Sequence, residues 1–201
     1  DRNGNRTTEM LCMTNPETVK VAVQTITEAF RNDPAAFIYG ISPPDGWPMC
    51  YCPDCMAALM GLRGRSMGGA DVSPEARARL LSQMADRVKE SGFTGKGFGD
   101  PSISELWFSF VNKVATEVKK EFPDRWILTD GYNSRVRPPE GIGQLSDNIT
   151  IWCAVISSCT FHPIGDPKCW QREDYEKILT RWTDMLHILF IYDYDPGKGL
   201  D

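Results

Sequence analysis

The chain reads IYGISPPDGWPMCYCPDC over residues 38–55. An apolar, β-prone run that extends to Ile41 predicts a strand, and a double proline ends it because proline cannot donate to a central sheet. Asp45 and Trp47 therefore fall on the loop that follows the carboxyl end of this strand. In α/β folds the loops at strand carboxyl ends form the mouth where binding and catalytic groups gather.

Strand and helix signals alternate along the rest of the chain. Apolar runs predict five strands, near residues 10–14, 37–42, 126–131, 149–156 and 188–193. Apolar side chains at helical spacing predict helices after Asn15-Pro16, from Ser73, from Ser102 and from Tyr175 to Leu186. Such alternation is typical of a mainly parallel sheet with right-handed crossovers.

Three of the expected strands end in an aspartate beside a tyrosine or tryptophan. This pattern favours the rim of a (β/α)8 barrel over a nucleotide-binding sheet, which would carry a glycine fingerprint. The fold prediction is therefore α/β: a partial (β/α)8 TIM barrel of about five parallel strands with flanking helices. It forms one domain over residues 1–201, with a helical, glycine-rich stretch at about residues 61–101.

Composition excludes several classes of partner. The chain has 201 residues, 41% of them hydrophobic, which suits one domain with a sizeable core. A net charge of -5 gives no basic excess for nucleic acid. No apolar run reaches the roughly 18 residues needed to span a bilayer, so no membrane partner is expected. Residues 1–9 are too polar for a signal peptide.

Several motifs carry a resemblance to a known family. They are Asn15-Pro16-Glu17, Ser42-Pro43-Pro44-Asp45-Gly46, the C-x-C-x-x-C run from Cys50 to Cys55, Phe110 to Ala115, Pro138-Pro139, the loop with Cys159, His162 and Cys169, and Ile191 to Tyr194. Together they resemble a bacterial family, the domain of unknown function 4838.

That family is similar to glycoside hydrolases of the α-glucuronidase and hexosaminidase types, which have a catalytic (β/α)8 barrel. The resemblance covers nearly the whole chain, with residues 61–101 as an insertion. It implies strands three to seven of a barrel, the remaining barrel strands lying outside this chain. It also implies a secreted or periplasmic protein.

Glycoside hydrolysis needs two carboxyl groups that flank the scissile bond. The candidates at strand ends are Asp45, Asp130 and Asp193. Asp45 is the first choice for general acid, because its neighbours Pro44 and Trp47 are expected to raise its pKa. Asp193 or Asp130 would be the base or nucleophile. The alternative is that Asp45 only caps a turn, since Pro-Asp-Gly is a standard turn sequence.

Aromatic side chains near the same strand ends are candidates for stacking on sugar faces. These substrate-binding candidates are Trp47, Tyr132, Trp152, Tyr192 and Tyr194, together with His162; Trp152 also suits the core. The predicted function is a glycoside hydrolase that acts on a poly- or oligosaccharide. The alternatives are a non-catalytic glycan-binding barrel with a structural cysteine cluster and a zinc-dependent hydrolase.

Seven cysteines cannot form a complete set of intrachain disulfides. Cys50, Cys52 and Cys55 are expected near the loop that carries Cys159 and Cys169. Joined by one of those two cysteines or by His162, they have the ligand types of a structural zinc site. Disulfides between rim loops and free thiols are the alternatives. No cofactor other than such a zinc ion is expected.

Overall fold

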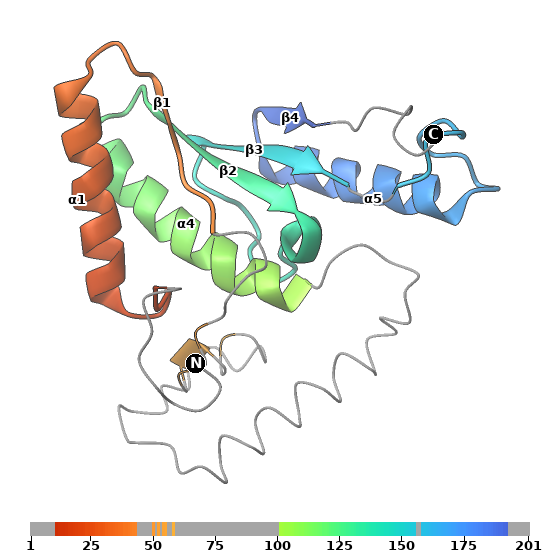
Figure 1. Cartoon of the computed structure of the whole chain (residues 1–201), viewed down its shortest axis with the longest axis horizontal. Helices are drawn as coiled ribbons and strands as arrows, with labels where there is room; N and C mark the ends of the chain where they lie inside the picture. Colours follow the sequence, from red (N-terminus) through yellow and green to blue (C-terminus); the bar gives the residue numbers. More distant parts are fainter. Residues whose placement is uncertain are drawn as a thin grey trace, which may run out of the picture.

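The computed structural model describes residues 11–43, 50, 52, 54, 55, 58, 101–155 and 158–192. Its elements are α1 (Pro16–Asn32), β1 (Ile38–Gly40), α4 (Pro101–Glu121), β2 (Trp126–Tyr132), the 3-10 helix η1 (Asn133–Arg135), β3 (Ile149–Ala154), α5 (Trp170–Met185) and β4 (Leu189–Ile191) (Figure 1). The four strands of this part of the chain form one parallel sheet in the order β1-β2-β3-β4.

The predicted α/β class, with a parallel sheet and flanking helices, is confirmed. Four of the five expected strands are present and form the described sheet. This four-stranded sheet does not close into a barrel. Residues 11–14 form a turn instead of the expected fifth strand. The reason is local: the Asn15 N–H bonds the Cys12 carbonyl at 3.2 Å, and the Asn15 side chain caps α1 at the Glu17 N–H. The expected insertion and the helix from Ser73 lie outside the described residues, except that α4 begins at Pro101.

One face of the sheet is buried beneath the helices. Side chains alternate between the two faces of a strand, and the residues of β2 and β3 on this face are Ile127, Thr129, Gly131, Ile149, Ile151 and Cys153, all buried. From α4, the Trp107 indole N–H donates to Thr129 Oγ1 at 3.0 Å. From α5, the Trp182 indole lies over Gly131, where a Cβ would meet Ile151 Cγ2 at 3.2 Å and Trp182 Nε1 at 3.6 Å.

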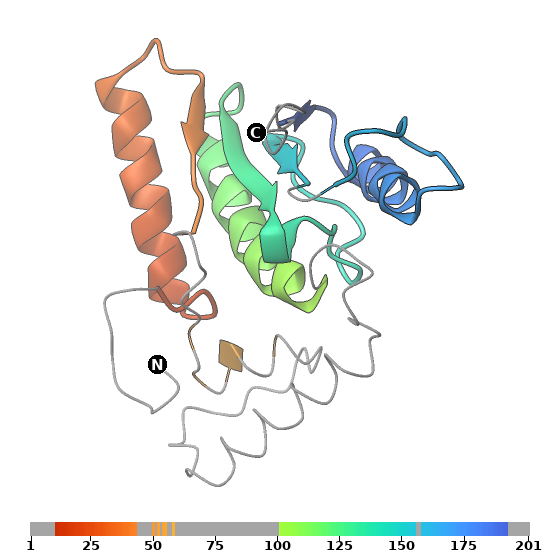
Figure 2. The ribbon, with the colours of Figure 1, turned by 45° about the vertical axis from the view of Figure 1, so that its right-hand side comes forward.

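The edge strand β1 is held by α1 and by an arginine. Phe30 of α1 contacts Tyr39 edge-on, with ring centroids 6.2 Å apart, while Arg31 pairs with Glu121 at 2.7 Å and joins α1 to α4. Figure 2 shows these two helices side by side. The guanidinium of Arg125 donates to the carbonyls of Ala36 and Pro34, both at 2.7 Å. These contacts hold the residues that directly precede the three-residue strand β1.

The opposite face carries a different set of side chains. Alternation places Asp130 and Tyr132 of β2, Trp152 of β3 and Phe190 of β4 there, and Tyr192 follows β4 in the same phase. Tyr132 and Trp152 are half-buried, and Phe190 and Tyr192 are 51% and 55% exposed. We call these four rings the aromatic face.

Among the described helices, none has the length and apolar character of a membrane-spanning segment.

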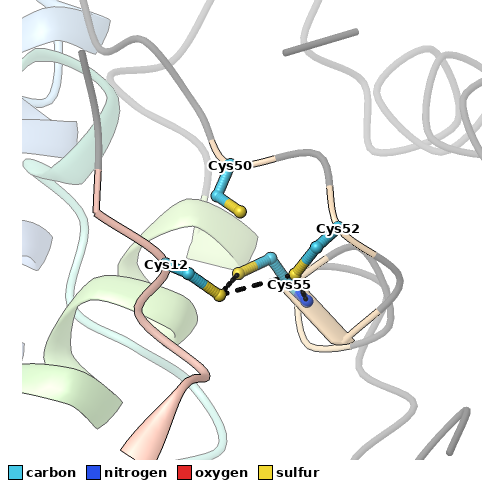
Figure 3. A group of neighbouring side chains, drawn as sticks. All are labelled: Cys12, Cys50, Cys52 and Cys55. Atoms are coloured by element: carbon cyan, nitrogen blue, oxygen red, sulfur yellow. Dashed lines mark hydrogen bonds between the residues drawn. The ribbon is translucent and has the colours of Figure 1, made fainter. Parts of the chain in front are cut away.

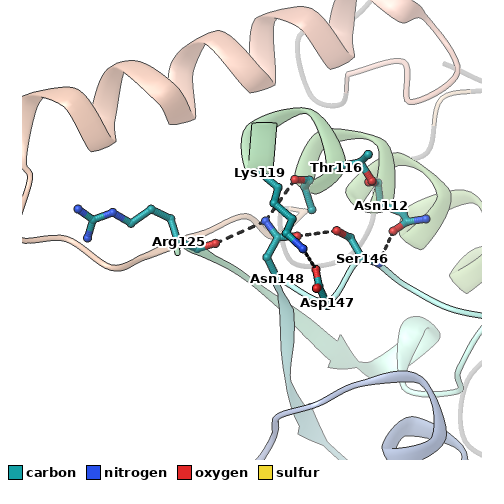
Figure 4. A network of polar contacts seen from close by, with 8 residues as sticks. Asn112, Thr116, Lys119, Arg125, Ser146, Asp147 and Asn148 are labelled. Carbon is teal, nitrogen blue, oxygen red and sulfur yellow. Dashed lines mark hydrogen bonds and ion pairs between the residues drawn. The ribbon is translucent and has the colours of Figure 1, made fainter. Parts of the chain in front are cut away.

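A polar network attaches the start of β3 to α4 (Figure 4). The backbone N–H of Ser146 donates to Asn112 Oδ1 at 2.7 Å, and Lys119 forms an ion pair with Asp147. The side chain of Asn148 is 4% exposed and donates to the carbonyls of Ala115 at 3.2 Å and Arg125 at 3.4 Å. No α-helix connects β2 to β3 in these residues, so this network fixes the register of β3 where a helix would otherwise do so.

Replacing Asn148 by alanine is predicted to destabilise the protein by about 1–3 kcal/mol, because it removes a buried side chain whose amide donates to two carbonyl groups. The free energy of unfolding is measured by urea denaturation. The matched control is Thr116→Ala, which removes an exposed hydroxyl that bonds the Asn112 carbonyl at 2.7 Å. The control is expected within about 0.5 kcal/mol of the unmodified protein. Equal effects of both substitutions would contradict the role given to Asn148.

Candidate functional site

The carboxyl ends of β2, β3 and β4 meet at one edge of the sheet because the strands are parallel. Asp130 lies beside Trp152 in the register of β2 and β3, and Trp152 lies beside Phe190 in that of β3 and β4. The rings of Tyr132 and Trp152 are stacked, with centroids 6.3 Å apart and planes at 29°. The rings of Trp152 and Tyr192 are 5.8 Å apart and tilted by 59°. Three rings thus form a continuous row across three strands.

Asp130 forms a buried ion pair beside this row. Its Oδ1 atom accepts from Nε of Arg135 at 2.8 Å, and each side chain is 5% exposed. The chain returns toward Asp130 because Asn133 adopts a left-handed conformation, with φ 52°, directly after β2. Asparagine tolerates that conformation better than most residues. Removing one partner of such a buried pair leaves an uncompensated charge.

The predicted site residues divide into three sets. Asp130, Tyr132, Trp152 and Tyr192 share one face and one edge of the sheet. The candidates Asp45, Trp47, Asp193 and Tyr194 lie outside the described residues. His162 belongs to neither set, since its Nδ1 atom lies 3.2 Å from Sγ of Cys159 in the loop after β3. Arg135, which sequence analysis missed, is the partner of Asp130; only its position five residues after Asp130 hinted at it.

A group of four cysteines lies at the amino end of α1 (Figure 3). The ligand atoms of Cys12, Cys50, Cys52 and Cys55 all lie within 4.8 Å of one another. Sγ of Cys12 is 3.5 Å from that of Cys52 and 3.7 Å from that of Cys55. All four are free thiols; Cys55 is fully buried and the others are half-buried. Two segments on either side of α1 and β1 therefore converge on one point.

The four thiols perturb one another's protonation. Hydrogen bonds with Cys50, then with Cys52 and Cys55, hold the pKa of the Cys12 thiol well below its usual range. The pKa of Cys55 is raised, first by Cys12 and then by Cys50 and Cys52. One thiolate is thus stabilised by its neighbours, while the next ionisation meets its negative charge. A cation bound among the four sulfur atoms would offset the repulsion between thiolates and favour ionisation of all four.

A second group comprises Cys159, His162 and Cys169, whose ligand atoms also lie within 4.8 Å of one another. The hydrogen bond with His162 lowers the pKa of Cys159 to about 6, and Cys159 raises the pKa of His162 in turn. His162 is exposed to solvent and Cys159 is half-buried. A thiol whose pKa is lowered by a hydrogen-bonded histidine is in the environment of a reactive cysteine.

The structure corrects the expected grouping of the cysteines. The run from Cys50 to Cys55 is completed by Cys12, and Cys159 and Cys169 form a separate group with His162. Cys12 escaped notice because its apolar neighbours Leu11 and Met13 were interpreted as a strand. The sequence did indicate that a further cysteine was needed, because the run from Cys50 to Cys55 supplies three thiols and a tetrahedral site needs four ligands.

The family model described as domain of unknown function (DUF4838) matches residues 1–197, so the chain belongs to this family. The family resemblance inferred from the motifs is thereby confirmed, and the match says nothing of a glycoside hydrolase or a TIM barrel. No curated protein and no solved structure matches the chain.

Alkylation of Cys159 by iodoacetamide is predicted to rise with pH and to level off above about pH 7, since the reactive thiolate forms with a pKa of about 6. His162→Ala removes the largest cause of that shift, so the midpoint should move toward the ordinary thiol value of 9.0. Peptide mass spectrometry of chelator-treated protein resolves each cysteine. Buried Cys153, whose pKa burial raises to about 12, should stay unmodified. An unchanged midpoint in His162→Ala would contradict the pairing.

Proposed function

We propose that this member of the DUF4838 family is a sector of a (β/α)8 barrel that binds a poly- or oligosaccharide and hydrolyses a glycosidic bond. The barrel is supported by the order of the four described strands, which follows the chain without reversal. A barrel is built in this way, with its helices on the outer face, whereas a doubly wound sheet reverses direction and has helices on both faces. The proposal leaves the aromatic face toward the barrel interior and completes the barrel with strands outside this chain.

The row of Tyr132, Trp152 and Tyr192 is the observation that carries the proposal. Aromatic rings offer an apolar surface to the C–H face of a sugar. Consecutive rings lie 6.3 and 5.8 Å apart, so the row is long enough to present more than one ring to a chain of sugars. Its place at the carboxyl edge matches the binding edge of parallel folds.

The hydrolytic step is proposed for the aspartates at strand ends. Asp45 donates a proton to the leaving oxygen, and Asp193 or Asp130 acts as base or nucleophile. Asp130 lies directly beside Trp152 in the sheet, with Arg135 at 2.8 Å. A carboxylate paired with a guanidinium suits the base or nucleophile better than the general acid, which must carry a proton to donate.

A second candidate function is glycan binding without hydrolysis. The observation that favours it is the same ion pair, since a buried carboxylate matched with Arg135 has a structural use that needs no substrate. Both candidates place a carbohydrate on the aromatic face. We also propose that the protein is secreted or exported to the periplasm, as the family resemblance implied, and encounters its polysaccharide there.

Tyr192→Ala is predicted to weaken glycan binding by roughly tenfold, which corresponds to about 1.4 kcal/mol. Tyr192 is 55% exposed, so its removal should leave the fold intact. The control is Phe161→Ala, which removes a ring that is 82% exposed in the loop after β3. Binding of soluble polysaccharides is measured by affinity electrophoresis and then by calorimetry. If both variants bind as the unmodified protein does, the aromatic row is not the binding surface.

Asp45→Asn is predicted to lower turnover by roughly 10²–10⁴, least for aryl glycosides with good leaving groups, which need little protonation. The control is Asp184→Asn on an exposed side of α5, which should keep full turnover. Hydrolysis is followed by reducing-end release in the full-length protein. Unchanged turnover in Asp45→Asn would exclude it as the acid. A protein that binds glycan through Tyr192 and hydrolyses none would support the second candidate.

A further inference from the structure

We infer that Cys12, Cys50, Cys52 and Cys55 bind a single zinc ion as a closed, four-thiolate structural site. This site is separate from the carboxyl edge where the glycan is proposed, and its failure would leave that proposal unaffected. Its evidence is the position of the sulfur atoms, the groups that surround them and the segments that they join.

The spacing of the sulfur atoms fits one tetrahedral ion. Zinc–sulfur bonds of about 2.3 Å at tetrahedral angles separate neighbouring sulfur atoms by about 3.8 Å. The sulfur of Cys12 lies 3.5 Å from Cys52 and 3.7 Å from Cys55, and all four ligand atoms fall within 4.8 Å of one another. A disulfide would need about 2.05 Å, and all four thiols are free. Thiolates bound to different irons of an iron–sulfur cluster would lie farther apart than this.

Hydrogen-bond donors surround the sulfur atoms as they do in zinc sites. The hydroxyl of Thr14 lies 3.4 Å from Sγ of Cys12 and 3.3 Å from Sγ of Cys55. The backbone N–H of Cys55 points to Sγ of Cys52 at 3.5 Å, a contact within the C-x-x-C turn. Such groups orient thiolate ligands and offset part of their charge.

Shelter from solvent also suits a structural ion. Cys55 and Met13 belong to the hydrophobic core, and Cys12, Cys50 and Cys52 pack against it. Four protein ligands leave no coordination position for a substrate, which is the distinction between structural and catalytic zinc. Four soft thiolates in a tetrahedron select zinc or iron among the common metals, and zinc fits a purely structural role because it has no redox chemistry.

The ion would fix two segments that the described sheet holds weakly. Cys12 precedes α1, whereas Cys50, Cys52 and Cys55 follow β1, an edge strand of three residues. One ion on both segments closes a loop of about forty residues around α1 and β1.

The test is the zinc content of the full chain, produced with zinc and purified without chelator, measured by elemental mass spectrometry. The unmodified protein should hold zinc, and Cys12→Ser should hold about one ion fewer, with its affinity for added zinc reduced on the order of 100-fold or more. The matched control is Cys159→Ser, which removes a thiol from the other group and should keep this ion. Cobalt substitution gives an independent signal, since four thiolates produce intense sulfur-to-cobalt absorption that Cys12→Ser weakens.

A measurement on the unmodified protein covers the case in which Cys12→Ser does not fold. Stepwise addition of a mercurial that blocks thiols should release zinc to a coloured indicator, and chelator-exposed protein should expose four more reactive thiols than zinc-loaded protein. Equal zinc in Cys12→Ser and unmodified protein would overturn the inference. So would iron in place of zinc, or disulfides among these four cysteines in protein purified without oxidant.

Discussion

The helices of the described chain cover one face of the sheet, and the opposite face carries the ion pair and the row of rings. Trp107 from α4 and Trp182 from α5 cover β2 and β3, and Gly131 leaves room for the second indole. Every other strand residue is thereby committed to the core. The alternate residues of β2 and β3 include Asp130, Tyr132 and Trp152, beside buried Thr150 and Ala154. The ion pair of Asp130 and the row of rings follow from this division.

The outer strands of the described sheet need contacts beyond backbone pairing. β1 and β4 each contribute three residues to the described sheet, and short edge strands gain little from backbone pairing alone. Arg125 reaches the carbonyls before β1, and the four thiols gather the segments on either side of α1 and β1. Within the sheet, Asn148 connects the start of β3 to α4, where no α-helix lies between β2 and β3. Polar contacts therefore hold the strand ends in place, whereas core packing holds the centre of the sheet.

Sequence patterns predicted the parts of the fold that depend on neighbours in the chain. The apolar run at residues 149–156 became β3, and Asn15 with Pro16 marked the start of α1, because strand periodicity and helix caps are local properties. The run at residues 10–14 misled because a short apolar segment suits a strand or a buried turn equally. Arg135 and Cys12 could not be assigned, since their partners depend on a left-handed residue and on a contact across about forty residues. His162 was a candidate for sugar binding and for the zinc site, and its hydrogen bond with Cys159, three residues earlier, is a finding of the structure.

Hydroxyl-radical footprinting of the full chain tests the central claim, that the aromatic face is the ligand surface, most directly. Trp152 and Tyr192 should lose reactivity in the presence of a bound oligosaccharide, because the sugar would cover their rings. Trp170, which is 43% exposed at the start of α5, should react at the same rate with and without the sugar. Protection of Trp170 with no protection of Trp152 or Tyr192, under conditions where binding is measured, would contradict the account.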